Sequence, residues 1–392
     1  MKSKMNRYLH LGASSAALFA LSCAPKDPRW VAPTPAAAPA KAQASPGERI
    51  NPKLDILFVI DNAEAMNKHQ DNLSNNIDKF ADVFKADASG GGGIDFHIGV
   101  TSLFDRTRWV KGKPDCDFDD GQLRPLKHMI KKDPNSNQLS EEILDGKQAG
   151  QPMRNYVSNQ DTDVAGFLKD TLKLGEQPFH KCGYKFEEEF GPVQAALSPP
   201  MLTGANLGFY RPDAHLAVII LSDADDETQD MTADQMKQVL LDAKGGNLNR
   251  ISVVAVTTSA DASDTSCPRD ADGPPVKLHE LVDKTQGQYL NLCDASFGEK
   301  LGKIASTIRQ KALTHIIPLK VTPDINTIVV HFGSQIVAPG DAGWTYDQNS
   351  KSILINGEFE LQGDPSLKIS VDYVGINMQN AFDGDRVHVE GQ

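Results

Sequence analysis

Acidic side chains follow two of the most apolar stretches of this 392-residue chain. Asp61 directly follows the apolar run 54–60, and Asp223 follows the run 215–221 after a single serine. Carboxylate oxygens are ligands that hard divalent cations such as Mg²⁺ and Ca²⁺ prefer. A further acidic run, 225–227, lies just beyond Asp223 and could create a different cation site.

Structural roles are the alternative for each of these carboxylates. Asp61 and Glu64 have the spacing of a capping box, which satisfies exposed backbone donors at a helix start. Asp223 could simply end a strand, and the acidic run 225–230 could be a solvated loop. The residue types alone leave both interpretations open.

The elements that position these carboxylates follow from hydrophobic patterning. The near-continuous apolar run before Asp61 predicts a strand buried on both faces. Further strands are expected at 94–102, 215–221, 251–256 and 288–292, and amphipathic helices alternate with them. This alternation predicts an α/β fold with a doubly wound, mostly parallel sheet and helices on both faces. Right-handed crossovers bring Asp61 and Asp223 together at the carboxyl edge of the sheet, where such folds bind ligands.

The stretch 54–66, LDILFVIDNAEAM, resembles the opening of the von Willebrand factor type A (VWA) domain. That family has an apolar strand followed by Asp-x-Ser-x-Ser, which helps to hold a divalent metal ion at the metal-ion-dependent adhesion site. Here the aspartate is Asp61, but Ala63 and Ala65 replace both serines. The phrase FHIGVTS at 96–102 is similar to the second strand of the family.

The resemblance implies a metal site in which Asp61 and Asp223 match the two family aspartates. The metal would be Mg²⁺ or Ca²⁺. Because Ala63 and Ala65 cannot replace the hydroxyl ligands, we expect binding of a protein or surface ligand at the strand-end face without a full metal site. Two alternatives are divalent-metal-dependent adhesion through Asp61 and Asp223, and a structural envelope component.

The chain beyond residue 313 has a different pattern. Short strand-like runs are separated by Gly, Asn, Asp and Pro, and no helical stripe interrupts them. We expect a small antiparallel β-sandwich within 314–392, with Trp344 in its core. The phrases NTIVVHFG and GWTYDQNSKSI resemble the β-domain appended to some bacterial VWA lipoproteins. The VWA-like part then covers 51–313.

The first 23 residues have the features of a lipoprotein signal peptide. Lys2, Lys4 and Arg7 precede the apolar stretch 9–21, which is short for a membrane span. The phrase Leu-Ser-Cys ending at Cys23 resembles the bacterial lipobox. The resemblance implies cleavage before Cys23, lipidation of this residue and attachment to the membrane.

In the lipoprotein pattern, Ala24 after the cysteine favours the outer membrane, on its periplasmic or surface-exposed side. The Pro- and Ala-rich segment 24–50 cannot bury a core, so we expect a tether between the anchor and the folded part. The predicted location is the bacterial cell envelope.

Four cysteines remain when Cys23 is set aside. They allow three disulfide pairings, and export favours disulfides over thiolate metal sites. Cys267 follows one predicted strand and Cys293 ends the neighbouring one, so Cys267–Cys293 is the first choice. Cys116–Cys182 is then the second pair. A thiolate metal site is the alternative, although the chain has no Cys-x-x-Cys.

Other functional classes find no support in the sequence. The formal net charge is −12 and no long Lys/Arg run is present, which argues against nucleic acid as a partner. The glycine run 90–93 lacks the Gly-Lys-Ser/Thr of a phosphate loop. No Gly-x-Ser-x-Gly or His-Glu-x-x-His motif is present. We therefore expect a binding protein and no enzyme.

Overall fold

In the computed structural model, all described residues belong to one compact unit. The residues that it describes are 52–85, 94–103, 121–131, 139–144, 154–174, 187–268, 273–340, 343–355, 369–376 and 386–390. The expected signal peptide with Cys23, the tether, and the cysteines Cys116 and Cys182 all lie outside these ranges. No helix within the described ranges is long and apolar enough to cross a membrane.

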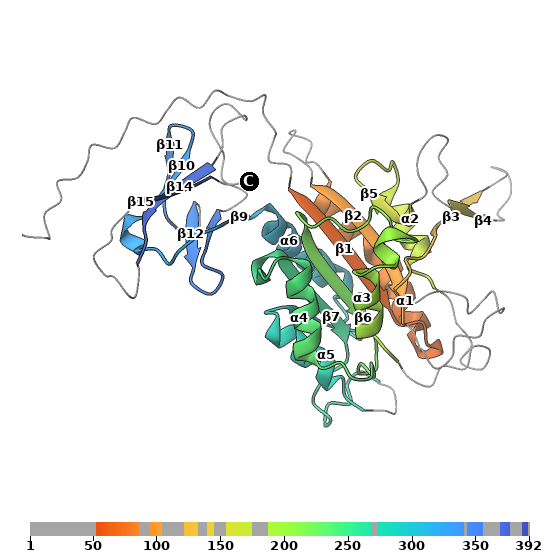
Figure 1. Cartoon of the computed structure of the whole chain (residues 1–392). Coiled ribbons are helices and arrows are strands. Elements are labelled where there is room, and N and C mark those ends of the chain that lie inside the picture. The colour runs from red at the N-terminus through yellow and green to blue at the C-terminus, as the bar shows by residue number, and fades with distance from the viewer. Residues whose placement is uncertain are drawn as a thin grey trace, which may run out of the picture. The chain divides into compact units, whose positions relative to one another are not determined.

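A six-stranded, mostly parallel sheet forms the centre of the α/β part (Figure 1). Its order is β5-β2-β1-β6-β7-β8, and only the edge strand β5 runs antiparallel to its neighbour. This arrangement confirms the predicted fold class. The strands are β1 (Lys53–Ile60), β2 (Asp95–Ser102), β5 (Tyr156–Ser158), β6 (His215–Leu221), β7 (Ile251–Thr257) and β8 (Gln288–Asn291). A separate antiparallel hairpin consists of β3 (Leu126–Lys131) and β4 (Leu139–Leu144).

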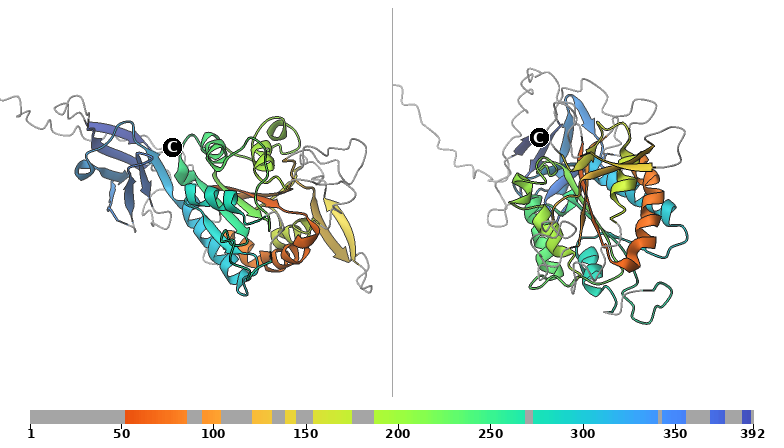
Figure 2. Two further views of the ribbon diagram at one scale, coloured as in Figure 1. Left: turned by 90° about the horizontal axis from the view of Figure 1, so that it is seen from below. Right: turned by 90° about the vertical axis from the view of Figure 1, so that its right-hand side faces the viewer.

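Helices cover both faces of this sheet (Figures 1 and 2). One layer contains α1 (Asn67–Ala81), α2 (Val164–Thr171) and α6 (Phe297–Leu313). The opposite layer contains α3 (Phe190–Ala196), α4 (Ala233–Ala243) and α5 (Val276–Lys284). Short 3-10 turns lie at η1 (Glu64–Met66), η2 (Asp82–Phe84), η3 (Met201–Thr203) and η4 (Leu248–Arg250).

The side chains of β1 alternate between two separate hydrophobic clusters. Phe58 and Ile60 pack with the layer of α1, α2 and α6. Leu57 and Val59 pack with the layer of α3, α4 and α5. The strand is therefore buried on both faces, which is the physical reason for its unbroken apolar run.

A buried polar network lies near the amino ends of the strands. The carboxylate of Asp55, in β1, accepts hydrogen bonds from the backbone N and Nε of Arg211, at 2.6 and 2.8 Å. Arg211 Nη1 also lies 2.7 Å from Asp95 Oδ1, and Lys244 Nζ donates to the Arg211 carbonyl at 2.8 Å. Burial raises the pKa of Asp55 to about 6 and lowers the pKa of Lys244 to about 8. The attraction between the two charges opposes both shifts. Folding therefore desolvates both charges at a cost.

His215, the first residue of β6, makes stability depend on pH. Its Nε2 lies 2.9 Å from Ser252 Oγ. Burial, aided by the positive charges of Lys311, Lys244 and Arg250, lowers its pKa to about 3. The folded state therefore favours neutral His215. Its stabilising contribution is complete above the unfolded pKa of about 6.5 and is lost as the pH falls towards about 3, by up to about 1.4 kcal/mol per pH unit.

Urea unfolding between about pH 7 and about pH 5 tests this expectation. The free energy of unfolding should fall more steeply in the natural chain than in a His215→Gln variant, which cannot take up the proton. A His279→Gln variant, altered in a histidine of α5, is the matched control. Equal slopes for the natural chain and His215→Gln would contradict the assignment.

The C-terminal part contains two antiparallel sheets around one core. The first has the order β11-β10-β14-β15 and the second β12-β13-β9. Trp344 is buried in the shared cluster and its indole N–H donates to the Val337 carbonyl at 3.0 Å. These observations confirm the predicted β-sandwich and the core position of Trp344. The elements are β9 (His315–Pro318), η5 (Ile325–Thr327), β10 (Val329–Phe332), β11 (Gln335–Val337), β12 (Trp344–Asp347), β13 (Ser352–Ile355), β14 (Ile369–Val374) and β15 (Arg386–Glu390).

Candidate functional site

Three polar residues form a row at the carboxyl edge of the sheet. Asp61 N donates to the Leu221 carbonyl at 2.8 Å, and Ser222 N donates to the Val256 carbonyl at 3.1 Å. These bonds continue the parallel ladders by one residue, so Asp61, Ser222 and Thr257 are in register. Side chains alternate between the two faces of a sheet along each strand. These three residues therefore lie on the face that α3, α4 and α5 cover.

Asp61 is completely buried and its side chain is engaged on both oxygens. Oδ1 accepts from the Ala63 N–H at 2.7 Å, and Oδ2 accepts from the Ser222 hydroxyl at 3.0 Å. The Asp61 carbonyl accepts from Gln70 Nε2 at 2.8 Å. Helix α1 is preceded by Met66 without a side-chain cap, so Asp61 orders the turn after β1 and does not cap α1.

The in-register neighbour of Asp61 is Ser222, and Asp223 follows one residue later. Asp223 is buried, with 5% of its surface exposed. The structure thus places both predicted aspartates at the ends of neighbouring strands, as the topology requires. Among the described residues, no three His, Cys, Asp or Glu side chains lie close enough together to hold a metal ion.

Glu189 was not predicted and is the most unusual side chain at this edge. It is completely buried, and neither carboxylate oxygen has a hydrogen-bond partner among the residues that the structure describes. Burial is the main cause that raises the pKa of Glu189 well above its ordinary value, and the charges of Asp226, Glu187 and Asp61 add to it. The Ser222 hydroxyl opposes this shift, but its single hydrogen is donated to Asp61.

The acidic run 225–227 has structural roles. Asp225 Oδ1 accepts from the N–H groups of Lys277 and Leu278, at 2.9 and 3.0 Å, and so caps the start of α5. Asp226 Oδ1 accepts from the N–H groups of Glu189 and Phe190, at 2.9 and 2.8 Å, and so caps the start of α3.

The ammonium group of Lys277 completes this arrangement. Its Nζ lies 2.5 Å from Asp226 Oδ2, and Glu227 Oε2 accepts from the Glu187 N–H at 3.0 Å. The run therefore joins α3 to α5 through Asp226 and Lys277. These bonds favour capping over the solvated-loop and separate-cation-site interpretations.

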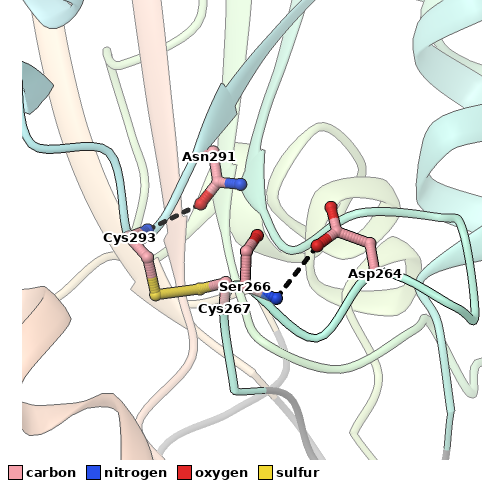
Figure 3. Close-up of a disulfide and its surroundings, with 5 residues drawn as sticks. All are labelled: Asp264, Ser266, Cys267, Asn291 and Cys293. Atoms are coloured by element: carbon pink, nitrogen blue, oxygen red, sulfur yellow. Dashed lines mark hydrogen bonds between the residues drawn. A yellow bond between two sulfur atoms is a disulfide. The ribbon is translucent and has the colours of Figure 1, made fainter.

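A disulfide ties the loop after β7 to the end of β8. Cys267 and Cys293 are bonded, as predicted from the adjacency of their strands (Figure 3). The Cys293 N–H donates to Asn291 Oδ1 at 2.8 Å, and the Ser266 N–H donates to Asp264 Oδ1 at 2.9 Å. The second predicted pair, Cys116–Cys182, lies outside the described residues.

Further buried polar atoms at this edge have no hydrogen-bond partner within the described ranges. They are Asn62 Nδ2, which follows Asp61, and the hydroxyls of Thr257 and Thr258 at the end of β7. Since most buried polar groups in folded proteins are paired, a gathering of unpaired ones at one edge marks a candidate binding site.

Glu189 and Ser222 were missed for identifiable reasons. Ser222 could have been found, because it extends the β6 ladder by one residue and must lie beside Asp61. Glu189 stands in the run 187–189 of three glutamates, which is typical of a solvated helix start. Its backbone N–H donates to Asp226, which is distant in sequence, and no local signal reveals that contact.

No family model matches this chain, and no curated protein matches it. Similar solved structures include proximal thread matrix protein 1 from the mussel byssus, at 10% identity and a TM-score of 0.34, over 68% of this chain and 50% of that one. Another structure of that protein has a zinc-occupied MIDAS motif, with 10% identity, a TM-score of 0.34 and coverage of 69% and 50%.

The human COPII-coat protein Sec24c is 11% identical with a TM-score of 0.36, over 87% of this chain and 44% of that one. The adhesive tip pilin GBS104 from Group B Streptococcus agalactiae is 8% identical with a TM-score of 0.32, over 79% and 77%. This chain spans about half the length of the first two proteins. These low values leave function to be argued from the residues of the chain itself.

Proposed function

We propose that this chain is a lipid-anchored protein of the bacterial cell envelope that binds another protein or surface ligand and catalyses no reaction. Its binding site is the carboxyl edge of the six-stranded sheet. The anchor is Cys23, which the lipobox resemblance supports, and the tether 24–50 separates the anchor from the folded part. The outer membrane is the proposed location.

One observation carries the choice of the binding edge. Unpaired buried polar atoms of Asn62, Glu189, Thr257 and Thr258 gather where the parallel strands end. Open α/β sheets bind ligands in this position. The exposed loop 261–266, which the disulfide of Cys267 ties to the sheet, gives this edge an accessible surface.

Divalent-metal-dependent adhesion through Asp61 and Asp223 is the second candidate. The unpaired carboxylate of Glu189 favours it, because a cation would compensate the buried negative charge. A structural envelope component without a ligand is the third class, and it is an outcome of the experiment below.

Site-specific photo-cross-linking in cells tests the proposed edge. A photo-reactive amino acid at Thr265, in the exposed loop, should form a discrete cross-link to another envelope component. The same amino acid at Gln238, exposed on α4, is the control and should form none. Equal cross-linking at both positions, or none at Thr265, would contradict binding at this edge and favour the structural class.

Two further arms separate the candidates. Cross-linking at Thr265 that disappears after EDTA treatment and returns with Mg²⁺ would support metal-dependent adhesion. Cross-linking that is insensitive to EDTA would support binding without a metal. A Cys23→Ser strain should release the protein from the membrane fraction, and retention there would contradict the lipid anchor.

A further inference from the structure

We propose that Arg250, Lys311 and His315 form a binding site for a phosphate group. The three residues lie at the amino edge of the six-stranded sheet, where the parallel strands begin. This is the opposite end of the strands from the binding edge proposed above. The inference concerns a second site and does not depend on the proposed function.

The fold brings these residues together around the start of β6. Arg250 immediately precedes β7, and the pairing of β6 with β7 puts Arg250 level with His215 on the neighbouring strand. Helix α6 packs against η4 and β6, and Lys311 lies in the last turn of this helix. His315 begins β9 directly after α6. All three residues of the proposed site are partly exposed, so a ligand can reach them.

The electrostatic effects of these residues on one another confirm that they are close. Burial is the main cause that lowers the pKa of His215, and the positive charges of Lys311 and Arg250 add to it. Burial also lowers the pKa of His315, and the charge of Arg250 again adds to the shift. The positive groups therefore face one another at this edge.

No negative charge compensates the cluster. Within the described ranges, no carboxylate lies at ion-pair distance from Arg250, Lys311 or His315. Burial lowers the pKa of Lys311, and no acidic neighbour opposes this shift. Lys244 differs, because the charge of Asp55 stabilises its ammonium group. Partly buried positive charges without a counter-charge are unfavourable, so an anionic ligand would stabilise this edge.

Asp347 approaches the cluster through Asn249, the neighbour of Arg250, and has other partners. Its Oδ2 accepts from Asn249 Nδ2 at 2.7 Å and from Ser350 Oγ at 2.6 Å. Its Oδ1 accepts from the Asn349 N–H at 3.0 Å. Neutral donors thus hold this carboxylate, and it does not form an ion pair with Arg250.

The donor set indicates the chemical class of the ligand. Arg250 can donate to two oxygens of a phosphate group in its planar fork, and Lys311 can donate to a third. The lowered pKa of His315 keeps its ring neutral near pH 7, with one N–H to donate. The two positive charges match a phosphate monoester, which carries about −1.5 to −2 near pH 7. A carboxylate would leave one positive charge uncompensated.

Lys311 also has a structural interpretation. Lysines in the last turn of a helix interact favourably with the negative end of the helix dipole. This role predicts that Lys311→Gln is less stable than the natural chain. The phosphate site predicts that Lys311→Gln is at least as stable in phosphate-free buffer, because glutamine removes an uncompensated charge.

Calorimetric titration of the full-length chain with inorganic phosphate tests the proposal, with thermal unfolding as the second readout. The natural chain should bind phosphate saturably and unfold at a higher temperature when phosphate is present. Arg250→Gln and Lys311→Gln should each weaken binding at least about tenfold, because a hydrogen bond to a charged group typically contributes that much. Lys303→Gln, at an exposed position of α6, is the charge-matched control and should bind phosphate as the natural chain does.

Two results would overturn the proposal. One is the absence of saturable phosphate binding by the natural chain. The other is unchanged binding by both variants, and lower stability of Lys311→Gln in phosphate-free buffer would then assign Lys311 to the helix end. If one variant does not fold, the other variant and the titration of the natural chain still decide the question.

Vesicle flotation separates a phosphate group carried by a lipid from a soluble one. The full-length chain with Cys23→Ser, which lacks the proposed lipid anchor, is mixed with phosphatidylcholine vesicles with and without phosphatidic acid. Flotation that requires phosphatidic acid and is lost in Arg250→Gln would identify a lipid headgroup as the source. Binding of inorganic phosphate without flotation would identify a soluble phosphate ester, and both results support the site. None of these measurements involves the loop of Thr265, so their failure is distinguishable from failure of the photo-cross-linking.

Discussion

Replacing Asp55 with alanine should lower the free energy of unfolding by about 3–5 kcal/mol, as expected when one partner of a buried ion pair is removed. Asp55 is fully buried and accepts three contacts from the N, Nε and Nη2 atoms of Arg211. The change leaves Arg211 and the buried Lys244 without their common counter-charge. Arg211 would keep only its ion pair with Asp95, and the charge of Lys244 would be desolvated without a carboxylate partner in this network.

Urea unfolding followed by circular dichroism measures this effect. Asp213→Ala removes the partner of Lys53 in an exposed ion pair and is the control, with an expected change of at most about 1 kcal/mol. Adding Lys244→Met to Asp55→Ala should restore part of the lost stability, because it removes one uncompensated charge. A loss below about 1 kcal/mol for Asp55→Ala would show that the network is not required for folding.

Asp226→Ala should have the second large effect and should lower the free energy of unfolding by about 3–5 kcal/mol. The Asp226 carboxylate is buried, caps α3 and pairs with Lys277. Its removal leaves the backbone N–H donors of Glu189 and Phe190 without an acceptor. The partly buried ammonium group of Lys277 loses its counter-charge and keeps only backbone carbonyl acceptors.

Urea unfolding followed by circular dichroism checks this prediction. Asp234→Ala, whose side chain is 71% exposed and pairs with Lys284, should change the unfolding free energy by at most about 1 kcal/mol. If Asp226→Ala unfolds like the natural chain, its hydrogen bonds do not stabilise the junction of α3 and α5.

Much of the fold could be predicted because it is encoded locally. The unbroken apolar runs that became β1 and β6 require burial on both faces, and this defines a parallel sheet between helices. The same topology made Cys267 and Cys293 neighbours, because their strands are adjacent. The change of pattern after residue 313 was likewise sufficient to predict the antiparallel β-sandwich.

The candidate site could be predicted only in part. Asp61 and Asp223 were identifiable because they directly follow or nearly follow apolar strands. The capping roles of Asp225 and Asp226 were not, because their partners lie in α3 and α5 and are distant in the sequence. The charge of Glu189 suggested exposure, whereas the structure buries it beside Ser222. Contacts between residues distant in the sequence determine where Asp225, Asp226 and Glu189 lie. Local hydrophobic periodicity does not predict such contacts.

The alternation of β1 has a practical consequence for protein engineering. Leu57 and Phe58 are adjacent in the chain, yet they belong to clusters on opposite sides of the sheet. A combinatorial library can therefore vary the surroundings of Phe58 without changing those of Leu57. Selection on the side of Leu57, Val59 and Asp61 would act on the residues next to the proposed binding edge. The hydrophobic cluster on the other side would remain unchanged and would continue to stabilise the fold.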